Sequence, residues 1–581
     1  MDIYWAFVPA CDRDAADHLE TLLQPIYFDG RPSLSIEPLT SICRAEGRGV
    51  SMIRKIMIRN YRCFRSLDLD LNPTMNIVVG DNDAGKSTLL EAINLALTSR
   101  VNGRTLDAEL SPHLINTDAA AEYAKALGAG DSALPPELII DLFLDETLES
   151  AILRGTNNLS TEDAVGLRIR ASLSQDFSEE YQAFIAKGDP ASLVPTEYYE
   201  VEWKGFSGNS ITARSVPATA SLIDASMIRL QNGADYYLQG MIADHLDKSE
   251  RVELARSYRS LRQEFTNNPA VQTINGKLAT TRGEISDREL SLSIDISHRF
   301  TWESSLVPHL DELPFQYVGK GEQHTLKVLL ALGRKLSASH VLLIEEPENH
   351  LAFATLNVLI AKIKEKCADR QIVMTTHSSF VLNKLGLDNL ILLNHDHAVR
   401  IDNLPASTQD YFMKLSGYDT LRLVLAKRVI LVEGPSDELV IQRAYLARHG
   451  KLPIEDGVDV INVRGLSFKR FLDIAVRLKR PTKVVTDNDG RPAADVEAGY
   501  AEYIASGFVS VHVGADSGGR TLEPQLLHAI GRADLNALLD QDFDTDDELL
   551  KYMTAHKTTC AVALFAADDT ALPSYIGDAV Q

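Results

Sequence analysis

Apolar segments of strand length recur along the chain, separated by polar turns and by stretches with helical periodicity. The first two, at residues 53–59 and 75–79, have the pattern of short strands. The second runs directly into a glycine-rich turn and then into the helical pattern of residues 87–97. Strand, turn and helix in this order form the local structure that a phosphate-binding loop requires.

The remaining strand patterns fall into three groups. The first group continues at 137–144, 166–173 and 197–203, the second comprises 341–344, 371–376 and 391–393, and the third comprises 428–434, 458–463 and 483–489. Helical patterns separate the strands of the later two groups, which predicts an α/β fold with parallel sheets. A polar helical tract from about Asp235 to Lys277 precedes the second group and predicts an insertion.

The size and composition are those of a folded protein with several domains. At 581 residues the chain is too long for one hydrophobic core, so we expect two or three domains. The five cysteines are scattered singly, which predicts neither a disulfide framework nor a zinc site and favours a reducing cytoplasm. The sequence has no apolar run that could span a bilayer, so we expect a cytoplasmic protein without a membrane partner. Residues 1–51 do not fit the α/β scheme, and we interpret them as an extension or as the product of an upstream start codon.

The turn after residues 75–79 matches the phosphate-loop pattern G-x-x-x-x-G-K-[ST], since it reads GDNDAGKS. In such a loop backbone N–H groups surround the phosphates, the lysine reaches the β and γ phosphates, and the hydroxyl holds Mg²⁺. The alternative is a glycine-rich turn with an incidental lysine. We expect ATP to be bound here by Gly80, Asn82, Gly85, Lys86, Ser87 and Thr88.

Three later segments indicate which kind of phosphate-loop protein this is. An apolar strand pattern ends in Glu345 and Glu346, an arrangement in which one carboxylate holds Mg²⁺ and the next polarises the attacking water. His377 follows another strand pattern, and Gly319 and Gly321 begin a helical segment whose N-terminus can bind a phosphate. Surface acids, a strand-end histidine and a helix cap are the simple alternatives. The order and spacing of the segments favour a nucleotide site.

Together these motifs resemble ABC-type ATPases of the RecF and SMC kind. The resemblance implies an ATPase in two parts, residues 52–234 and 301–420, separated by a helical insertion at 235–300 that acts as a dimerisation element. Glu346 and His377 would be catalytic, Glu345 would help to bind the nucleotide, and Gly319 and Gly321 would bind the nucleotide of a partner subunit. A homo-oligomer, either a dimer or a tetramer, is therefore expected. Glu345 replaces the usual aspartate, so hydrolysis is expected to be slow.

A second set of acids follows the third group of strands. Glu433 ends the strand pattern at 428–434, Asp437 comes four positions later, and Asp487 and Asp489 end the pattern at 483–489. Carboxyl ends of neighbouring parallel strands meet at one edge of a sheet, so we expect these acids to converge. Carboxylates gathered in this way favour divalent cations, and a pair of Mg²⁺ or Mn²⁺ ions can cleave a phosphodiester.

This second pattern resembles the Toprim domain, here at residues 421–581, and most closely that of the OLD (overcoming lysogenization defect) nucleases, which join an ABC ATPase to a Toprim domain. The resemblance implies that Glu433 is catalytic and that the metals are bound by Glu433, Asp437, Asp487, Asp489 and Glu523. It also implies that Lys557 stabilises the transition state. The spellings EGPSDE and TDND resemble the branch that contains the nuclease subunit of the Gabija anti-phage system, which implies bacterial defence and a UvrD-like helicase partner.

The net charge of −23 argues, taken alone, against nucleic acid as a partner. A local basic segment between the two acid motifs argues the other way, although a solvated helix face is the simple alternative. Its predicted DNA contacts are Lys469, Arg470, Arg477, Lys479 and Arg480.

The sequence therefore predicts an ATP-dependent, metal-dependent DNA endonuclease. The alternative is an ATP-switched DNA-binding or repair protein of the RecF and SMC kind without nuclease activity.

Overall fold

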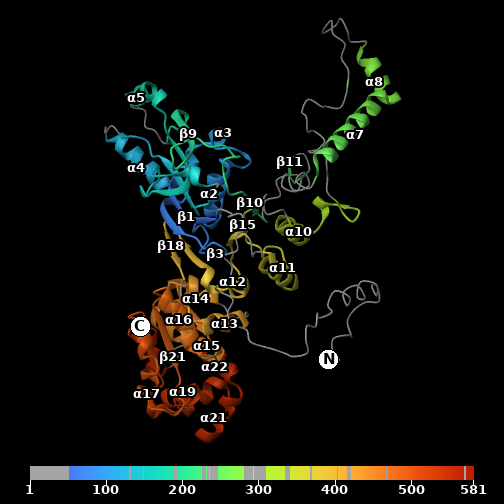
Figure 1. Ribbon diagram of the computed structural model, residues 1–581. Helices are drawn as coiled ribbons and strands as arrows, with labels where there is room; N and C mark the ends of the chain where they lie inside the picture. The colour runs from blue at the N-terminus through green and yellow to red at the C-terminus, as the bar shows by residue number, and fades with distance from the viewer. Residues whose placement is uncertain are drawn as a thin grey trace, which may run out of the picture. The chain divides into compact units, whose positions relative to one another are not determined.

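The computed structural model in Figure 1 describes most of the chain from residue 52 onward. The described residues are 52–129, 133–147, 150–186, 193–224, 230–231, 234–235, 246–279, 292, 309–333, 340–366, 370–401, 404–414, 420–465, 467–567 and 571–581. The predicted extension at 1–51 and much of the predicted insertion at 235–300 lie outside these residues.

An antiparallel sheet forms the first layer of the N-terminal part, with the strand order β2-β1-β6-β8-β7 and with β9 paired to β8. Its strands are β1 (Ile53–Tyr61), β2 (Phe64–Asp70), β6 (Leu138–Leu144), β7 (Arg154–Gly155), β8 (Ala164–Leu173) and β9 (Tyr199–Gly205). The predicted strands of the first group are thus confirmed, but they pair antiparallel with β1 and with one another.

A second, mainly parallel sheet has the order β10-β15-β16-β3-β17-β18. Its strands are β3 (Met75–Val79), β10 (Ala220–Asp224), β15 (Val341–Glu345), β16 (Gln371–Thr375), β17 (Leu390–Asn394) and β18 (His397–Arg400), of which β18 is antiparallel to β17. Helices α10 (Lys320–Gly333), α11 (Phe353–Lys366) and α12 (Ser379–Leu385) connect or flank these strands. Every residue of β3 and β16 is buried, as expected for central parallel strands.

Helix α2 (Lys86–Thr98) packs between the two sheets. Its Leu89, Ile93 and Leu95 are fully buried in one cluster with side chains of β1, β6 and β8 and of β15 and β16. The residues that follow the phosphate loop are therefore held by both layers.

The C-terminal unit, orange to red in Figure 1, contains a parallel sheet of order β20-β19-β21-β22. The strands are β19 (Arg428–Val432), β20 (Val458–Asn462), β21 (Thr482–Thr486) and β22 (Val509–Val513), and the helices that concern the site are α15 (Pro435–His449), α16 (Phe468–Arg477), α19 (Leu522–Ile530), α22 (Lys557–Ala566) and α23 (Ser574–Ala579). The predicted α/β alternation is confirmed. The predicted domain boundary at 420/421 falls within α14 (Thr420–Leu425).

The polar tract is helical over α7 (Lys248–Asn267) and α8 (Pro269–Ala279). Asp247 and Glu250 form a capping box at the start of α7. The predicted helical start near Asp235 is wrong, because Ala234–Asp235 is a short strand, β12, paired with Leu230–Gln231, β11.

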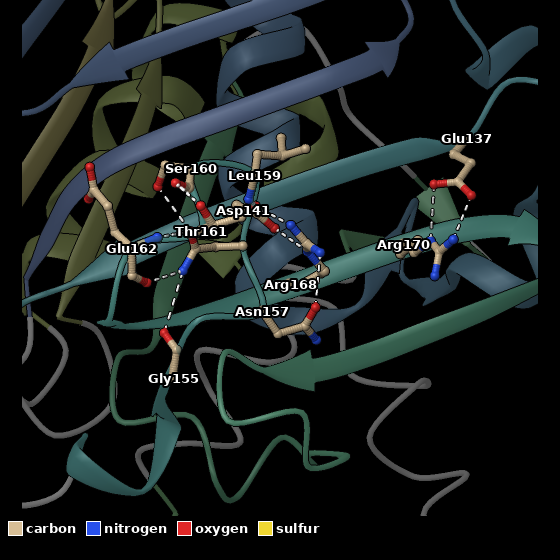
Figure 2. Close-up of polar contacts among 11 residues, drawn as sticks. Glu137, Asp141, Gly155, Asn157, Leu159, Ser160, Thr161, Glu162, Arg168 and Arg170 are labelled. Carbon is tan, nitrogen blue, oxygen red and sulfur yellow. Dashed lines mark hydrogen bonds and ion pairs between the residues drawn. The ribbon is translucent and has the colours of Figure 1, made fainter.

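One buried ion pair joins the two central strands of the antiparallel sheet (Figure 2). Asp141 on β6 is fully buried, and its carboxylate accepts hydrogen bonds of 2.7 Å from both Nε and Nη2 of Arg168 on β8. The N–H of Leu159 donates to the same carboxylate at 2.6 Å. The carboxylate is thus fully paired in a place that water does not reach.

We expect Arg168→Met to destabilise the fold by about 3–5 kcal/mol, because it leaves the buried Asp141 charge without its partner. The double variant Asp141→Leu with Arg168→Met should recover most of this loss. Urea unfolding followed by circular dichroism measures both changes. Equal midpoints for the parent and Arg168→Met would contradict the assigned role of the pair.

Candidate functional site

The phosphate loop connects β3 to α2 and has the backbone shape that its glycines predict. Gly85 has a φ of 97°, and a Cβ there would lie 2.7 Å from the Phe64 ring and 2.8 Å from Cys63 Sγ. At Gly80 a Cβ would lie 2.4 Å from the Leu393 carbonyl oxygen. A side chain at either position would displace the loop, so both glycines are required by packing.

Lys86 and Ser87, the last two residues of the loop, both make hydrogen bonds within the site. Lys86 Nζ donates to the carbonyl oxygens of Gly80 at 3.0 Å and Asp81 at 2.8 Å, and burial lowers the pKa of this lysine. Ser87 Oγ donates to a carboxylate oxygen of Glu345. The two residues predicted to share a Mg²⁺ ion are therefore in direct contact.

Glu346 and His377 form a second contact beside the loop. His377 Nε2 lies 3.3 Å from Glu346 Oε1, and burial, followed by the charge of Lys86, lowers the pKa of the imidazole. Glu346 has a φ of 44° and its N–H donates to the Thr375 carbonyl at 3.1 Å, which ties the loop after β15 to the end of β16. An unfavourable backbone conformation at this carboxylate is typical of a functional position.

An open cavity of about 780 Å³ joins these groups. It is lined by the predicted residues Asn82, Gly85, Lys86, Ser87, Thr88, Glu346 and His377. Arg62 and His113 also line it, although nothing in their local sequence had marked them. The structure thus brings most of the predicted nucleotide residues to one site.

Gly319 and Gly321 do not line this cavity in the described part of the chain. They lie at the start of α10, where a Cβ on Gly321 would be 2.3 Å from the His350 carbonyl oxygen. His324 Nε2 lies 3.0 Å from the Pro347 carbonyl oxygen, so the helix packs on the loop that follows Glu346. Their contact with a partner's nucleotide stays a prediction.

Glu348 is a residue for which the sequence had suggested no role. Its Oε1 accepts hydrogen bonds from Thr376 Oγ1 at 2.8 Å and from the His377 N–H at 2.6 Å. Burial raises the pKa of this carboxyl. Glu348 therefore fixes the backbone that carries His377, a role that depends on the pairing of β15 with β16 and gives no local signal.

The acids of the C-terminal unit converge at the carboxyl ends of β19 and β21. Burial, followed by the nearby charges of Asp437, Glu433 and Glu523, raises the pKa of Asp487 to about 8. Burial and the charge of Glu433 raise the pKa of Asp437 to about 6. The charges of these acids act on one another, so the four carboxylates lie near one another at this edge of the sheet and are called the carboxylate cluster.

Hydrogen bonds orient this carboxylate cluster. Glu433 Oε1 accepts from Thr486 Oγ1 at 2.6 Å and from the Asp487 N–H at 3.3 Å. Glu523 is 5 % exposed and lies 2.9 Å from Lys557 Nζ, and this bond raises the pKa of the lysine. The predicted lysine is thus placed at the edge of the cluster.

Asp489 lies apart from the four acids of the cluster. Its side chain is 64 % exposed and 3.8 Å from Arg491, and its backbone has a φ of 51°. The neighbouring Asn488 is buried and donates to the carbonyl oxygens of Gly514 and Gly519 at 3.2 and 2.9 Å, which holds the loop in place. Asp489 therefore lies at the mouth of the site.

A cavity of about 320 Å³ opens beside the cluster, lined by Glu433, Asp489 and Arg491 together with Lys469 and Tyr500. The ammonium of Lys469 lies 5.8 Å from the centre of the Tyr500 ring. Acids, cations and an aromatic ring are therefore combined in this one cavity.

Tyr575 is a further residue that sequence reasoning missed. It is 7 % exposed, and burial, followed by the charges of Asp487 and the other cluster acids, raises its pKa. It comes from α23, far along the chain, and nothing in its local sequence marks it.

The donor set of the cluster fits Mg²⁺ or Mn²⁺. Oxygen ligands with mutually raised pKa values are those that a hard cation relieves of repulsion. Among the described residues, no three His, Cys, Asp or Glu side chains stand in a geometry that already defines a metal site. Cation binding would therefore require local adjustment of these side chains.

The basic segment divides into two classes of side chain. Arg470 Nη1 donates to Ser407 Oγ at 2.6 Å and to Thr408 Oγ1 at 2.8 Å, and Arg480 Nη2 donates to the Val424 carbonyl at 2.7 Å. Lys469, Arg477 and Lys479 are exposed. Internal contacts thus occupy Arg470 and Arg480.

Comparison with known proteins identifies both parts of the chain. The family model "Overcoming lysogenization defect protein-like, TOPRIM domain" matches residues 424–489, and two AAA domain models match residues 55–126 and 220–383, the second described as "putative AbiEii toxin, Type IV TA system". The chain therefore combines an AAA-type ATPase with an OLD-like TOPRIM domain, the combination of domains found in OLD-family proteins.

An ATP/GTP phosphatase of Helicobacter pylori is 21 % identical over 349 residues, 56 % of this chain and 85 % of that protein, and two other relatives match over short segments. The DNA replication and repair protein RecF of Actinobacillus pleuropneumoniae is 37 % identical over 67 residues, 12 % of this chain and 18 % of RecF. The OLD nuclease of Thermus scotoductus is 44 % identical over 46 residues, 8 % of each chain. The matched region thus spans less than a fifth of either of these two relatives.

Among solved structures, the SmcHead bound to the C-winged helix domain of ScpA is similar with a TM-score of 0.32 and 14 % identity, covering 60 % of this chain and 98 % of that one. The strand orders of the two sheets define the fold of this part of the chain. Among the described residues no helix is long and apolar enough to cross a membrane.

We expect the metal-free protein to lose stability as the pH rises toward about 8, because the raised pKa of Asp487 favours its protonated form in the fold. One proton contributes at most about 1.4 kcal/mol per pH unit. Thermal melting in EDTA between about pH 5 and pH 8 measures this slope. Mg²⁺ should oppose the loss, and Asp487→Asn should flatten the slope. An unchanged slope in that variant would contradict the burial of a titrating Asp487.

Proposed function

We propose that this chain is a DNA endonuclease that depends on divalent cations and is regulated by ATP. The observation that carries the proposal is the cluster of Glu433, Asp437, Asp487 and Glu523 with Lys557 at the carboxyl edge of an OLD-like TOPRIM sheet. The intact phosphate loop in the same chain supports the regulation by nucleotide.

Two Mg²⁺ or Mn²⁺ ions held by these four carboxylates would polarise the phosphodiester and activate a water molecule. Glu433 is held by Thr486 and the Asp487 N–H, so it can present its free oxygen at a fixed position. Lys557 would place positive charge beside the transferring phosphoryl group, where stabilisation of the developing charge matters most. Asp489, at the mouth, would contribute only on substrate binding.

DNA would approach through the cavity that Lys469, Arg491 and Tyr500 share with Glu433. Lys469, Arg477 and Lys479 are exposed and would contact backbone phosphates, whereas Arg470 and Arg480 would act through their internal contacts. Because the proposed substrate is DNA, we also propose that the protein acts in the cytoplasm. The resemblance of the acid motifs to the Gabija branch supports a role in anti-phage defence with a UvrD-like helicase.

In the ATPase, Lys86, Ser87 and Glu345 would hold the nucleotide and its Mg²⁺, Glu346 would polarise water, and His377 would sense the γ phosphate. The ATP-switched DNA-binding protein without cleavage is the second candidate, favoured by the similarity to RecF over 67 residues.

Self-association is proposed through the helical insertion. On α7, Leu254, Leu261 and Phe265 are 37 %, 60 % and 45 % exposed, and their spacing of seven and four positions puts them on one face. An exposed apolar stripe of this kind fits a second copy of the chain.

We expect Glu433→Ala and Asp487→Ala each to lower the cleavage rate by about a hundredfold or more, because stabilisation at the transferring phosphoryl group is lost. Nicking of supercoiled plasmid with Mg²⁺ or Mn²⁺ measures the rate, and EDTA should abolish it in the parent. Asp547→Ala, an exposed acid in the first turn of α21 (Asp546–Ala555), is the matched control and should cleave normally.

Lys86→Ala should abolish ATP binding, measured with a fluorescent nucleotide, while metal-dependent cleavage persists. If folded Asp487→Ala cleaves at the parent rate, the nuclease proposal fails and the ATP-switched DNA-binding protein becomes the better account.

Leu261→Glu should shift the protein toward the monomer in light scattering, because a charge replaces an apolar contact at the centre of the stripe. Glu264→Lys, an exposed substitution on the same helix, is the control. A parent that is monomeric with and without ATP would exclude the assembly.

A further inference from the structure

Helix α14 is bonded to α12, the helix that follows His377. Thr420 on α14 is fully buried, and its Oγ1 donates to Asn383 Oδ1 on α12 at 2.7 Å. Asn383 is 1 % exposed, so this contact is shielded from water. The Leu421 N–H donates to Ser379 Oγ, at the start of α12, at 3.4 Å. The two helices are therefore held together by buried polar bonds.

The N-terminus of α12 is in turn bonded to the nucleotide site. Ser378 caps the helix by accepting from the Val381 N–H at 3.4 Å, and its own N–H donates to Thr376 Oγ1 at 3.0 Å. Thr376 and His377 both donate to Glu348. A displacement of His377 must therefore act on the start of α12.

On its other side α14 is bonded to the nuclease sheet through Arg422. The guanidinium donates to Asp459 Oδ2 at 3.0 Å and Oδ1 at 2.5 Å, and to the Val460 carbonyl at 2.9 Å, both on β20. Its Nη2 also lies 3.8 Å from Glu438 Oε1. Glu438 stands next to Asp437 in the first turn of α15, and its second oxygen accepts from Asn462.

Apolar packing makes this connection stiff. Leu421, Leu423 and Val424 of α14 belong to the same buried cluster as Phe468 and Phe471 of α16. Closely packed interiors transmit small displacements because they have no free volume to absorb them.

We propose that α14 couples the nucleotide site to the nuclease carboxylates, with Thr420 and Arg422 as the positioning residues. The inference rests on the proposed function. When ATP binds, His377 exchanges Glu346 for the γ phosphate, α12 follows, and Thr420 moves α14. Arg422 then shifts Glu438 and with it the turn that carries Asp437. The state of the nucleotide thereby sets the geometry of the carboxylate cluster.

The test compares DNA cleavage with and without ATP in the full-length parent and in Thr420→Val and Arg422→Met. Thr420→Val preserves shape and removes only the bond to Asn383. Arg154→Met is the matched control, since it removes an exposed arginine–aspartate pair, Arg154 with Asp163, that lies outside the connection. ATP binding is measured in every variant with a fluorescent nucleotide.

In the parent, ATP should change the cleavage rate by about fivefold or more, the range of typical coupling between sites. Thr420→Val should bring the ratio of the two rates close to one, with unchanged cleavage in the absence of ATP and unchanged ATP binding. Arg422→Met should also bring the ratio close to one with unchanged ATP binding, and Arg154→Met should keep the parent ratio.

A parent ratio retained in both Thr420→Val and Arg422→Met overturns the inference. A parent that cleaves equally with and without ATP overturns the inference and leaves the nuclease intact. A parent that cleaves no DNA under any metal condition overturns the proposed function, and the inference falls with it.

Discussion

Parallel hydrogen bonding forces strands to end together, and both candidate sites depend on this constraint. In the ATPase sheet, Glu345 pairs with Thr375 and Thr375 with Val78, so the acids at the end of β15, the segment that leads to His377 and the phosphate loop reach the same edge. In the C-terminal sheet, β19 and β21 are paired in the same sense, which brings Glu433 beside Asp487. Residues separated by hundreds of positions meet without any local signal.

The acids of the nucleotide site have bonded partners, whereas most acids of the nuclease site lie beside other acids. In the nucleotide site the acids have partners: Glu345 contacts Ser87, and Glu346 contacts His377. In the nuclease site, burial and repulsion raise the pKa values of Asp437 and Asp487, and of the charged partners only Lys557 is bonded to the cluster within the described residues. Without a cation the carboxylates of such a site repel one another. Metal binding relieves this repulsion and is favoured for that reason.

Tertiary contacts give the residues of the basic segment different roles, although the sequence predicts the same role for all of them. Arg470 and Arg480 are basic residues that lie next to Lys469 and Lys479 in the sequence. Their guanidinium groups, however, donate to Thr408 and Val424, on the segment that joins the two α/β units. An arginine can satisfy several acceptors at once, which suits it to such internal positions, whereas a lysine remains a solvated point charge.

The sequence by itself determined the strands, the phosphate loop and the acids at strand ends, because apolar periodicity and glycine spacing are local properties. It also predicted the pairing of distant motifs, since parallel strands leave few alternatives. It could not find Glu348, whose role comes from Thr376 and His377 on another element, or the buried Tyr575 beside the cluster, and it could not separate Asp489 from the four acids of the cluster. That distinction depends on a positive φ and on Asn488, which hold the Asp489 side chain toward solvent, and only the folded loop decides them.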